Sequence, residues 1–226
     1  CRYCRHWTAF SGVVFSKVGN LQFFSHLDLQ RTWQRVLVRA SIPMWYTQGF
    51  NPHSKIVFGI PLSVGTEGTH EMVDLRIDRA ITPDEMRDQL NAELTDEMQV
   101  SAVYIPTTAF SDIAYATYTV TVSDPSAASV DADAVEALFA PGAAPILMTK
   151  RTKSGDREMD ILPLIREIHA AREADGTLIL HATLAAGGSA NLSPEFLVAA
   201  LREKLGMLTD TEHPDVCWYR ILRTGF

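Results

Sequence analysis

The residues best suited to chemistry lie in two short runs within the first 60 residues. One run is Ser25-His26-Leu27-Asp28, and the other is Gln48-Gly49-Phe50-Asn51-Pro52-His53-Ser54-Lys55. Together they hold two imidazoles, which change charge near neutral pH, beside hydroxyl, carboxylate and amide groups that form hydrogen bonds. Such groups are typical of sites that transfer protons or bind phosphate, and either activity requires elements that hold the side chains in place.

The first run predicts the start of a helix and argues against a nucleophilic triad. Ser25 with Asp28 three residues later fits a capping box, and apolar residues then recur at helical spacing to about Ala40. Neighbouring residues on a helix point in different directions, so these side chains cannot line up as nucleophile, base and acid. The free N–H groups of a helix start are suited to binding an anion, and the alternative is a purely structural cap.

The predicted helix carries a row of cations. Arg31, Arg35 and Arg39 recur every four residues, which places them on one face. Residues 1 to 60 contain seven Lys or Arg and one acid, a net charge of +6, whereas residues 61 to 226 contain 13 bases and 26 acids. Guanidinium groups grip phosphate oxygens. We therefore expect the cations of the first 60 residues to gather on one face and bind an anionic partner, and the alternative is a solvated helix face.

The second run predicts an exposed loop. Gly49 and Asn51-Pro52 favour a shaped turn, which would display Asn51 and His53. Trp45, Tyr46 and Phe50 interleave with the basic residues, as in proteins that stack unpaired bases on aromatic rings, although each ring is also suited to the core. We expect this loop to fold back over the start of the helix, so that His26 and His53 share one surface pocket.

Hydrophobic periodicity divides the chain into two halves with the same order of elements. In the first half, strand patterns occur at 13–18, 55–60, 73–78 and 100–105, and helical patterns occur at 26–40 and 82–94. The second half repeats this plan, with a hairpin at 146–161 and an extra helix at 163–172. The helix openings Thr82-Pro83-Asp84 and Ser193-Pro194-Glu195 match, which suggests an internal duplication.

These patterns predict an α+β protein made of two tandem ferredoxin-like (βαββαβ) modules with antiparallel sheets, the second of which carries an inserted helix. We place the amino-terminal module, with the basic His/Arg cluster, at residues 1–108 and the carboxy-terminal module at residues 109–226. A single larger α+β domain with one continuous sheet is the alternative.

Composition predicts a cytoplasmic protein. Cys1, Cys4 and Cys217 are too few for a disulfide framework, and no apolar run approaches the ~18 residues of a membrane span. Cys1 and Cys4 have the spacing of half a zinc site, but the other half is missing. We therefore predict no metal and no cofactor for the chain on its own.

Several motifs resemble those of the radical SAM-associated family known as domain of unknown function 2344 (DUF2344). They are Phe15-Ser16-Lys17, the two runs described above, the turn from Gly59 to Pro61, and Arg223-Thr224. The resemblance extends over nearly the whole chain from about Val13. Members of this family occur beside or fused to radical SAM proteins, so the resemblance implies a partner of that kind, in RNA-linked or ribosome-linked modification.

We therefore expect an accessory domain that binds RNA or another phosphate-bearing substrate and presents it to a radical SAM protein, without catalysis of its own. The predicted binding residues are Ser25, His26, Asp28, Arg31, Arg35, Gln48, Asn51, His53 and Lys55. One alternative is a metal-independent ribonuclease in which His26 or His53 acts as general base on a 2′-hydroxyl. The other is a protein-interaction module whose motifs shape a docking surface.

Overall fold

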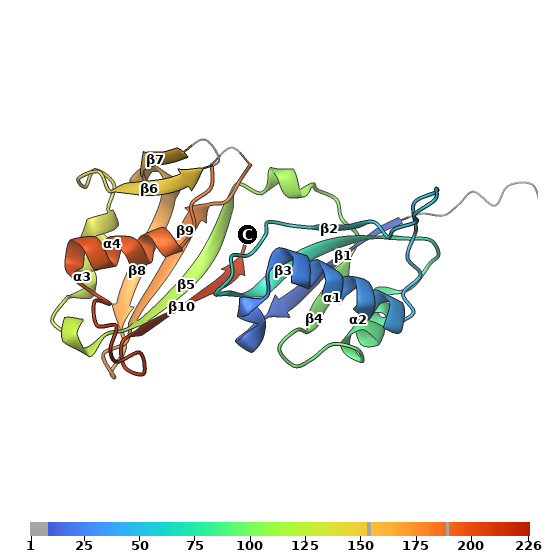
Figure 1. The fold of residues 1–226 in the computed structure, drawn as a ribbon, viewed down its shortest axis with the longest axis horizontal. Coiled ribbons are helices and arrows are strands. Elements are labelled where there is room, and N and C mark those ends of the chain that lie inside the picture. Colours follow the sequence, from blue (N-terminus) through green and yellow to red (C-terminus); the bar gives the residue numbers. More distant parts are fainter. Residues whose placement is uncertain (1–8, 153–154, 189) are drawn as a thin grey trace, which may run out of the picture. The chain divides into compact units, whose positions relative to one another are not determined.

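The computed structural model describes residues 9–152, 155–188 and 190–226 (Figure 1). The predicted Cys1 and Cys4 pair lies outside the described residues. The chain divides into two compact units, of which the first ends at Asp112 and the second runs from Ile113 to Phe226. The fold class is α+β, with antiparallel strand pairs and four α-helices in the described part. No helix of the described ranges is long and apolar enough to cross a membrane.

The first unit alternates strands and helices around one antiparallel sheet. Strand β1 pairs with both β3 and β4, and the short β2 pairs with the other edge of β3, so the strand order is β4-β1-β3-β2. The elements are β1 (Ala9–Lys17), α1 (His26–Arg39), β2 (Ile56–Phe58), β3 (Thr66–Ile77), α2 (Pro83–Asn91) and β4 (Val100–Tyr104), with 3-10 turns at Gly19–Phe23 and Phe110–Asp112.

One core joins both helices of this unit to one face of the sheet. Helix α1 buries the predicted stripe at helical spacing, and the ring of Trp33 meets the edge of Phe15 from β1 with their centroids 4.9 Å apart. Strand β3 buries alternate residues, as its sequence predicts. The core residues of the four main elements include Val13, Phe15, Leu29, Trp33, Val36, Leu37, Val73, Leu75, Ile77, Met86 and Leu90.

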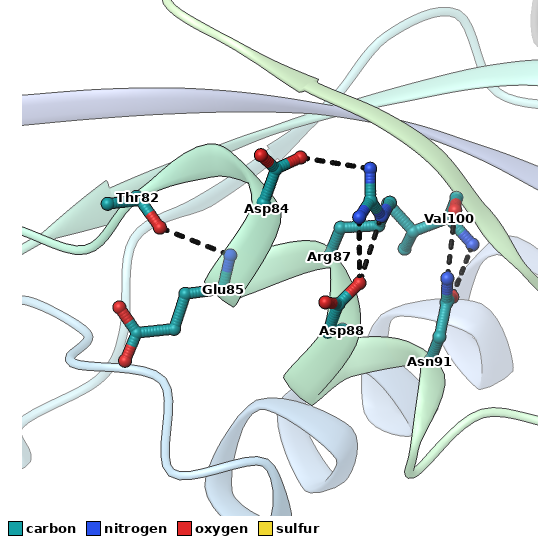
Figure 2. A network of polar contacts seen from close by, with 7 residues as sticks. All are labelled: Thr82, Asp84, Glu85, Arg87, Asp88, Asn91 and Val100. Atoms are coloured by element: carbon teal, nitrogen blue, oxygen red, sulfur yellow. Dashed lines mark hydrogen bonds and ion pairs between the residues drawn. The ribbon is translucent and has the colours of Figure 1, made fainter.

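Polar contacts hold α2 in place and pair its arginine with two of its acids (Figure 2). The hydroxyl of Thr82 accepts a hydrogen bond from the Glu85 N–H and so caps the helix, which confirms the helix opening predicted at Thr82-Pro83-Asp84. Arg87 lies between two acids, with its Nη1 3.0 Å from Asp84 Oδ1 and its Nη2 2.9 Å from Asp88 Oδ1. Asn91 at the end of the helix accepts from the Val100 N–H at 2.7 Å and donates to the Val100 carbonyl at 3.0 Å, and so ties α2 to the start of β4.

The second unit has the same strand order with a hairpin added. Its sheet runs β10-β5-β9-β8, and β6 and β7 form a separate two-stranded hairpin, as predicted. The elements are β5 (Tyr115–Ser123), α3 (Ala132–Phe139), β6 (Leu147–Thr152), β7 (Gly155–Asp160), β8 (Ile165–Arg172), β9 (Leu178–Ala185), α4 (Glu195–Leu205) and β10 (Trp218–Gly225), with 3-10 turns at Pro125–Ala127 and Leu162–Leu164.

The inserted helix predicted at residues 163–172 is wrong, because this segment is a 3-10 turn followed by strand β8. The pairing of β8 with β9 shifts register between Ile165 and Glu167. Such a bulge adds one residue to a strand, so two side chains on the same face are separated by three residues and not by two. Ile165 and Ile168 have this spacing, which imitates the period of a helix.

The second matching helix opening is confirmed only in part. Helix α4 begins at Glu195, next to the predicted position, but its N-cap is Pro194 and no side chain caps the first turn. Ser193 contributes its carbonyl, which accepts from the Phe196 N–H at 3.0 Å. The two openings therefore share a sequence pattern without sharing the same cap.

We predict that Asn91→Ala lowers the free energy of unfolding by about 1 to 3 kcal/mol, because it leaves the buried Val100 N–H and carbonyl without their side-chain partner. Urea denaturation followed by circular dichroism measures this loss. Asp88→Asn is the matched control on the same helix, and it removes only an exposed ion pair, so it should leave stability nearly unchanged. Equal stability of both variants would contradict the role of Asn91.

Candidate functional site

The amino terminus of α1 forms the predicted capping box. The Ser25 hydroxyl accepts from the Asp28 N–H at 3.2 Å, and the Ser25 N–H and hydroxyl both donate to the Asp28 carboxylate, at 3.3 and 2.6 Å. The hydrogen bond from the Ser25 hydroxyl, assisted by the charge of Arg31, lowers the pKa of Asp28. An ionised carboxylate at this helix start repels phosphate, so the anion site suggested by the sequence does not suit this terminus.

His26 lies exposed on the first turn of α1 and contacts β2. Its ring meets the ring of Phe58 edge-on, with the centroids 5.3 Å apart and the planes at 82°. Neither Ser25 nor Asp28 is available to activate this imidazole, because both serve the cap. The contact with Phe58 therefore gives His26 a packing role at the junction of α1 and β2.

His53 closes the second run into a defined loop. The Thr47 N–H donates to the His53 carbonyl at 3.0 Å, and the His53 N–H donates to the Thr47 hydroxyl at 3.1 Å. The imidazole Nδ1 lies 3.3 Å from the same hydroxyl and 3.2 Å from the Asn51 carbonyl. A proton on Nδ1 donates to that carbonyl and leaves Nε2 as an acceptor for other groups. His53 thus shapes the loop, on which Gln48 and Asn51 are exposed.

The structure does not bring the two imidazoles into one pocket. His26 contacts Phe58, the last residue of β2, whereas His53 lies three residues before Ile56, the first residue of that strand. Ser54 bridges to Tyr46, and from Lys55 onward the chain lies along β3, where the Arg76 N–H donates to the Lys55 carbonyl and Ile56 pairs with Leu75. Five extended residues, the number from His53 to Phe58, span roughly 16 Å, which separates His53 from the residue that His26 contacts. The expectation that this loop folds back over the helix start is therefore wrong.

The exposed face of α1 carries the arginine row. Arg31 and Arg35, together with Gln34, Val38 and Arg39, line a shallow hollow. Arg39 is engaged, because its Nε lies 2.8 Å from a Glu93 carboxylate oxygen and its Nη2 donates to the Glu93 carbonyl at 3.0 Å. Among the residues that the structure describes, no acid forms an ion pair with Arg31 or Arg35. This differs from α2, where two acids flank Arg87 (Figure 2).

The predicted gathering of all the cations on one face is wrong. Lys17 is buried, with its ammonium donating to the carbonyls of Gln22 and Thr66, because it falls on the same face of β1 as Val13 and Phe15. Arg2 and Arg5 lie outside the described residues, and Arg39 is paired. The exposed cations that remain are Arg31, Arg35 and Lys55.

The aromatic residues near the second run have different environments. The Arg76 guanidinium lies 3.9 Å above the ring of Trp45, so this ring is already covered on one side. Tyr46 is 44% exposed, and Phe50 at the tip of the loop is 99% exposed. Of the three predicted stacking residues, Phe50 therefore presents the most surface to a ligand.

A second cluster, which the sequence did not predict, lies on the sheet face opposite the core. The Lys55 ammonium lies 5.6 Å from the ring centroid of Phe10, and the Tyr104 ring covers Gly12, where a Cβ atom would collide with it. Burial raises the pKa of Asp74 on β3, and burial followed by the charge of Asp74 raises the pKa of Tyr104. In the sequence, the alternation of Asp74 with the buried Val73 and Leu75 indicates that Asp74 lies on this opposite face.

Comparisons with known proteins give a family and no activity. Residues 12–194 match the family described as "Uncharacterized protein conserved in bacteria (DUF2344)". No curated protein matches the chain. A similar solved structure is the "Crystal Structure of an Unknown Protein from Galdieria sulphuraria", with 15% sequence identity and a TM-score of 0.28 over 97% of this chain and 99% of that chain. In the described ranges, no group of three or more His, Cys, Asp or Glu is placed to hold a metal ion.

We predict that Ser25→Ala lowers the free energy of unfolding by about 1 kcal/mol, since a helix N–H loses its cap. Ser25→Asn should retain most of the stability, because asparagine caps equally well. Urea unfolding of the three proteins tests this structural role. If alanine and asparagine were equally tolerated, the motif would not be needed as a cap and a functional role for Ser25 would be favoured.

Proposed function

The chain belongs to the bacterial family described as an uncharacterized protein (DUF2344), and we propose that it is an RNA-binding accessory domain that works with a radical SAM partner. In this proposal the first unit binds a phosphate-bearing substrate, with RNA as the favoured class, and presents it for modification. The chain itself supplies binding and no catalysis.

The exposed arginine pair on α1 carries the proposal. Arg31 and Arg35 form no ion pair with any acid of the described chain, and of that chain's many acids Asp28 is the one whose pKa responds to the charge of Arg31. They lie one helical turn apart, a rise of about 6 Å, so two neighbouring phosphates of one strand can be contacted together. Arg39 beside them is neutralised by Glu93, so the unpaired charge of this face comes from Arg31 and Arg35. A surface of this kind binds anions by charge and geometry.

The surrounding sequence supports an anionic ligand. From Leu29 to Thr66 the chain contains no Asp or Glu. This stretch includes the exposed face of α1 and the whole loop with Gln48, Asn51 and His53. Phosphate binding without competing acids is typical of nucleic-acid interfaces, in which Lys and Arg neutralise the backbone.

We further infer that both units are ferredoxin-like modules. The support is their order of elements, strand-helix-strand-strand-helix-strand, together with the strand orders β4-β1-β3-β2 and β10-β5-β9-β8. The second unit inserts the β6-β7 hairpin between its first helix and its second sheet strand. Such a module leaves one sheet face free of helices, which is the face that carries Phe10, Asp74 and Tyr104.

The partner in this proposal rests on the resemblance of the His26 and His53 motifs to a family whose members occur beside or fused to radical SAM proteins. A cytoplasmic location follows from the same proposal. Co-purification of this chain with its adjacent or fused radical SAM protein tests the partnership, and complete separation of the two at low salt would count against it.

The ribonuclease alternative has lost its main support. It requires His26 or His53 to act as a general base, whereas the His26 ring packs on Phe58 and Nδ1 of His53 bonds within its own loop. Protein docking stays as the alternative class, and salt dependence separates it from RNA binding.

We predict that the chain binds a single-stranded RNA of about 15 nucleotides with an affinity that falls as salt rises. Arg31→Gln and Arg35→Gln should each reduce the log–log salt slope by about 0.7, because each removes one phosphate contact. Fluorescence anisotropy at several salt concentrations gives the slope. Arg87→Gln is the control with the same change in charge, and it should leave the slope unchanged. Salt-independent binding, or none at low salt, would reject the proposal.

A further inference from the structure

We propose that Phe50 stacks on an unpaired base, which makes single-stranded RNA the substrate class of the first unit. This inference rests on the proposed function and adds to it the residue that separates single strands from duplexes. The arginine pair binds the phosphates of any strand, whereas a stacking ring requires a base that is not already paired.

The exposure of Phe50 is the first observation. The side chain is 99% exposed, while the phenylalanine of the unit's core, Phe15, is 1% exposed. The fold gains no packing from Phe50. Both faces of its ring are therefore free to stack on a planar ligand, in contrast with Trp45, which has Arg76 above one face.

The loop that carries this ring is built to a defined shape. Gly49 has a φ of 141°, a conformation that L side chains rarely adopt, and it precedes Phe50 directly. Two hydrogen bonds close the loop, because the Thr47 N–H donates to the His53 carbonyl and the His53 N–H donates to the Thr47 hydroxyl. Nδ1 of His53 adds a contact to the Asn51 carbonyl. Because the loop backbone is braced, it loses little conformational freedom when Phe50 meets a ligand, and this favours binding.

The groups beside Phe50 suit a nucleobase. Gln48 and Asn51 flank the ring in sequence, are exposed, and can hydrogen-bond the edges of a base. The Asn51 carbonyl fixes Nδ1 of His53, which leaves Nε2 to meet a donor. Lys55 is the nearest cation in the sequence, and no acid occurs in this loop. A protein partner that received Phe50 in an apolar pocket would be matched by apolar residues beside Phe50. The residues beside Phe50 are polar, so they favour a nucleobase.

The test compares Phe50→Trp, Phe50→Leu and the parent chain in binding one RNA that contains 2-aminopurine, in single-stranded and in duplex form. We expect Phe50→Leu to weaken single-strand binding about tenfold and to abolish the fluorescence change of 2-aminopurine, because leucine is apolar without being able to stack. Phe50→Trp should bind at least as tightly as the parent. The salt slope should be the same for all three proteins, because no phosphate contact changes.

Phe23→Leu is the matched control, since this exposed phenylalanine lies outside the loop, and it should bind like the parent. If Phe50→Leu bound as tightly as Phe50→Trp while each arginine variant still showed its reduced salt slope, the stacking role would be overturned and the proposed function would stand. Duplex binding equal to single-strand binding would overturn it as well. If instead the parent chain failed to bind any RNA and Phe50→Leu weakened capture of a protein partner, the proposed function itself would fall.

Discussion

The packing of α1 on the sheet is the constraint on which the candidate site depends. Trp33 is entirely buried and meets Phe15 edge-on, and Leu29, Val36 and Leu37 are buried on the same stripe. Packing of this stripe against the sheet fixes the orientation of α1 about its own axis. Arg31 and Arg35 lie off that stripe and must face solvent. The same contacts that stabilise the core therefore display the charges, and the capping box fixes where the helix begins.

The loop is positioned by β3 in a similar way. Met44 bridges to Ile77, Tyr46 bridges to Ser54, and Ile56 pairs with Leu75, so the chain leaves and rejoins the sheet at neighbouring places on one edge. The residues between Tyr46 and Ser54 have no strand to join and must project beyond it. Hydrogen bonds among Thr47, Asn51 and His53 then give this projection a fixed form. Exposure of Phe50 is a consequence of the sheet register.

Local rules account for what the sequence predicted correctly. The capping box at Ser25 and the apolar period of α1 depend on neighbours within a turn, and so does the alternation in β3. Strand β8 was missed because a bulge at Ile165 gives a strand the spacing of a helix. Lys17 was counted as a surface cation although its alternation with Phe15 pointed inward. The distance between His26 and His53 depends on where the loop leaves the sheet edge, and composition carries no information on that.

The central claim is that the exposed face of α1 and the loop around Phe50 both contact RNA. Photo-crosslinking of a 4-thiouridine-labelled single-stranded RNA, followed by mass spectrometry of the attached peptides, tests it most directly. The account predicts crosslinks within residues 26–55, including Phe50, that disappear as salt is raised. Crosslinks confined to the second unit, where acids are abundant, would contradict it.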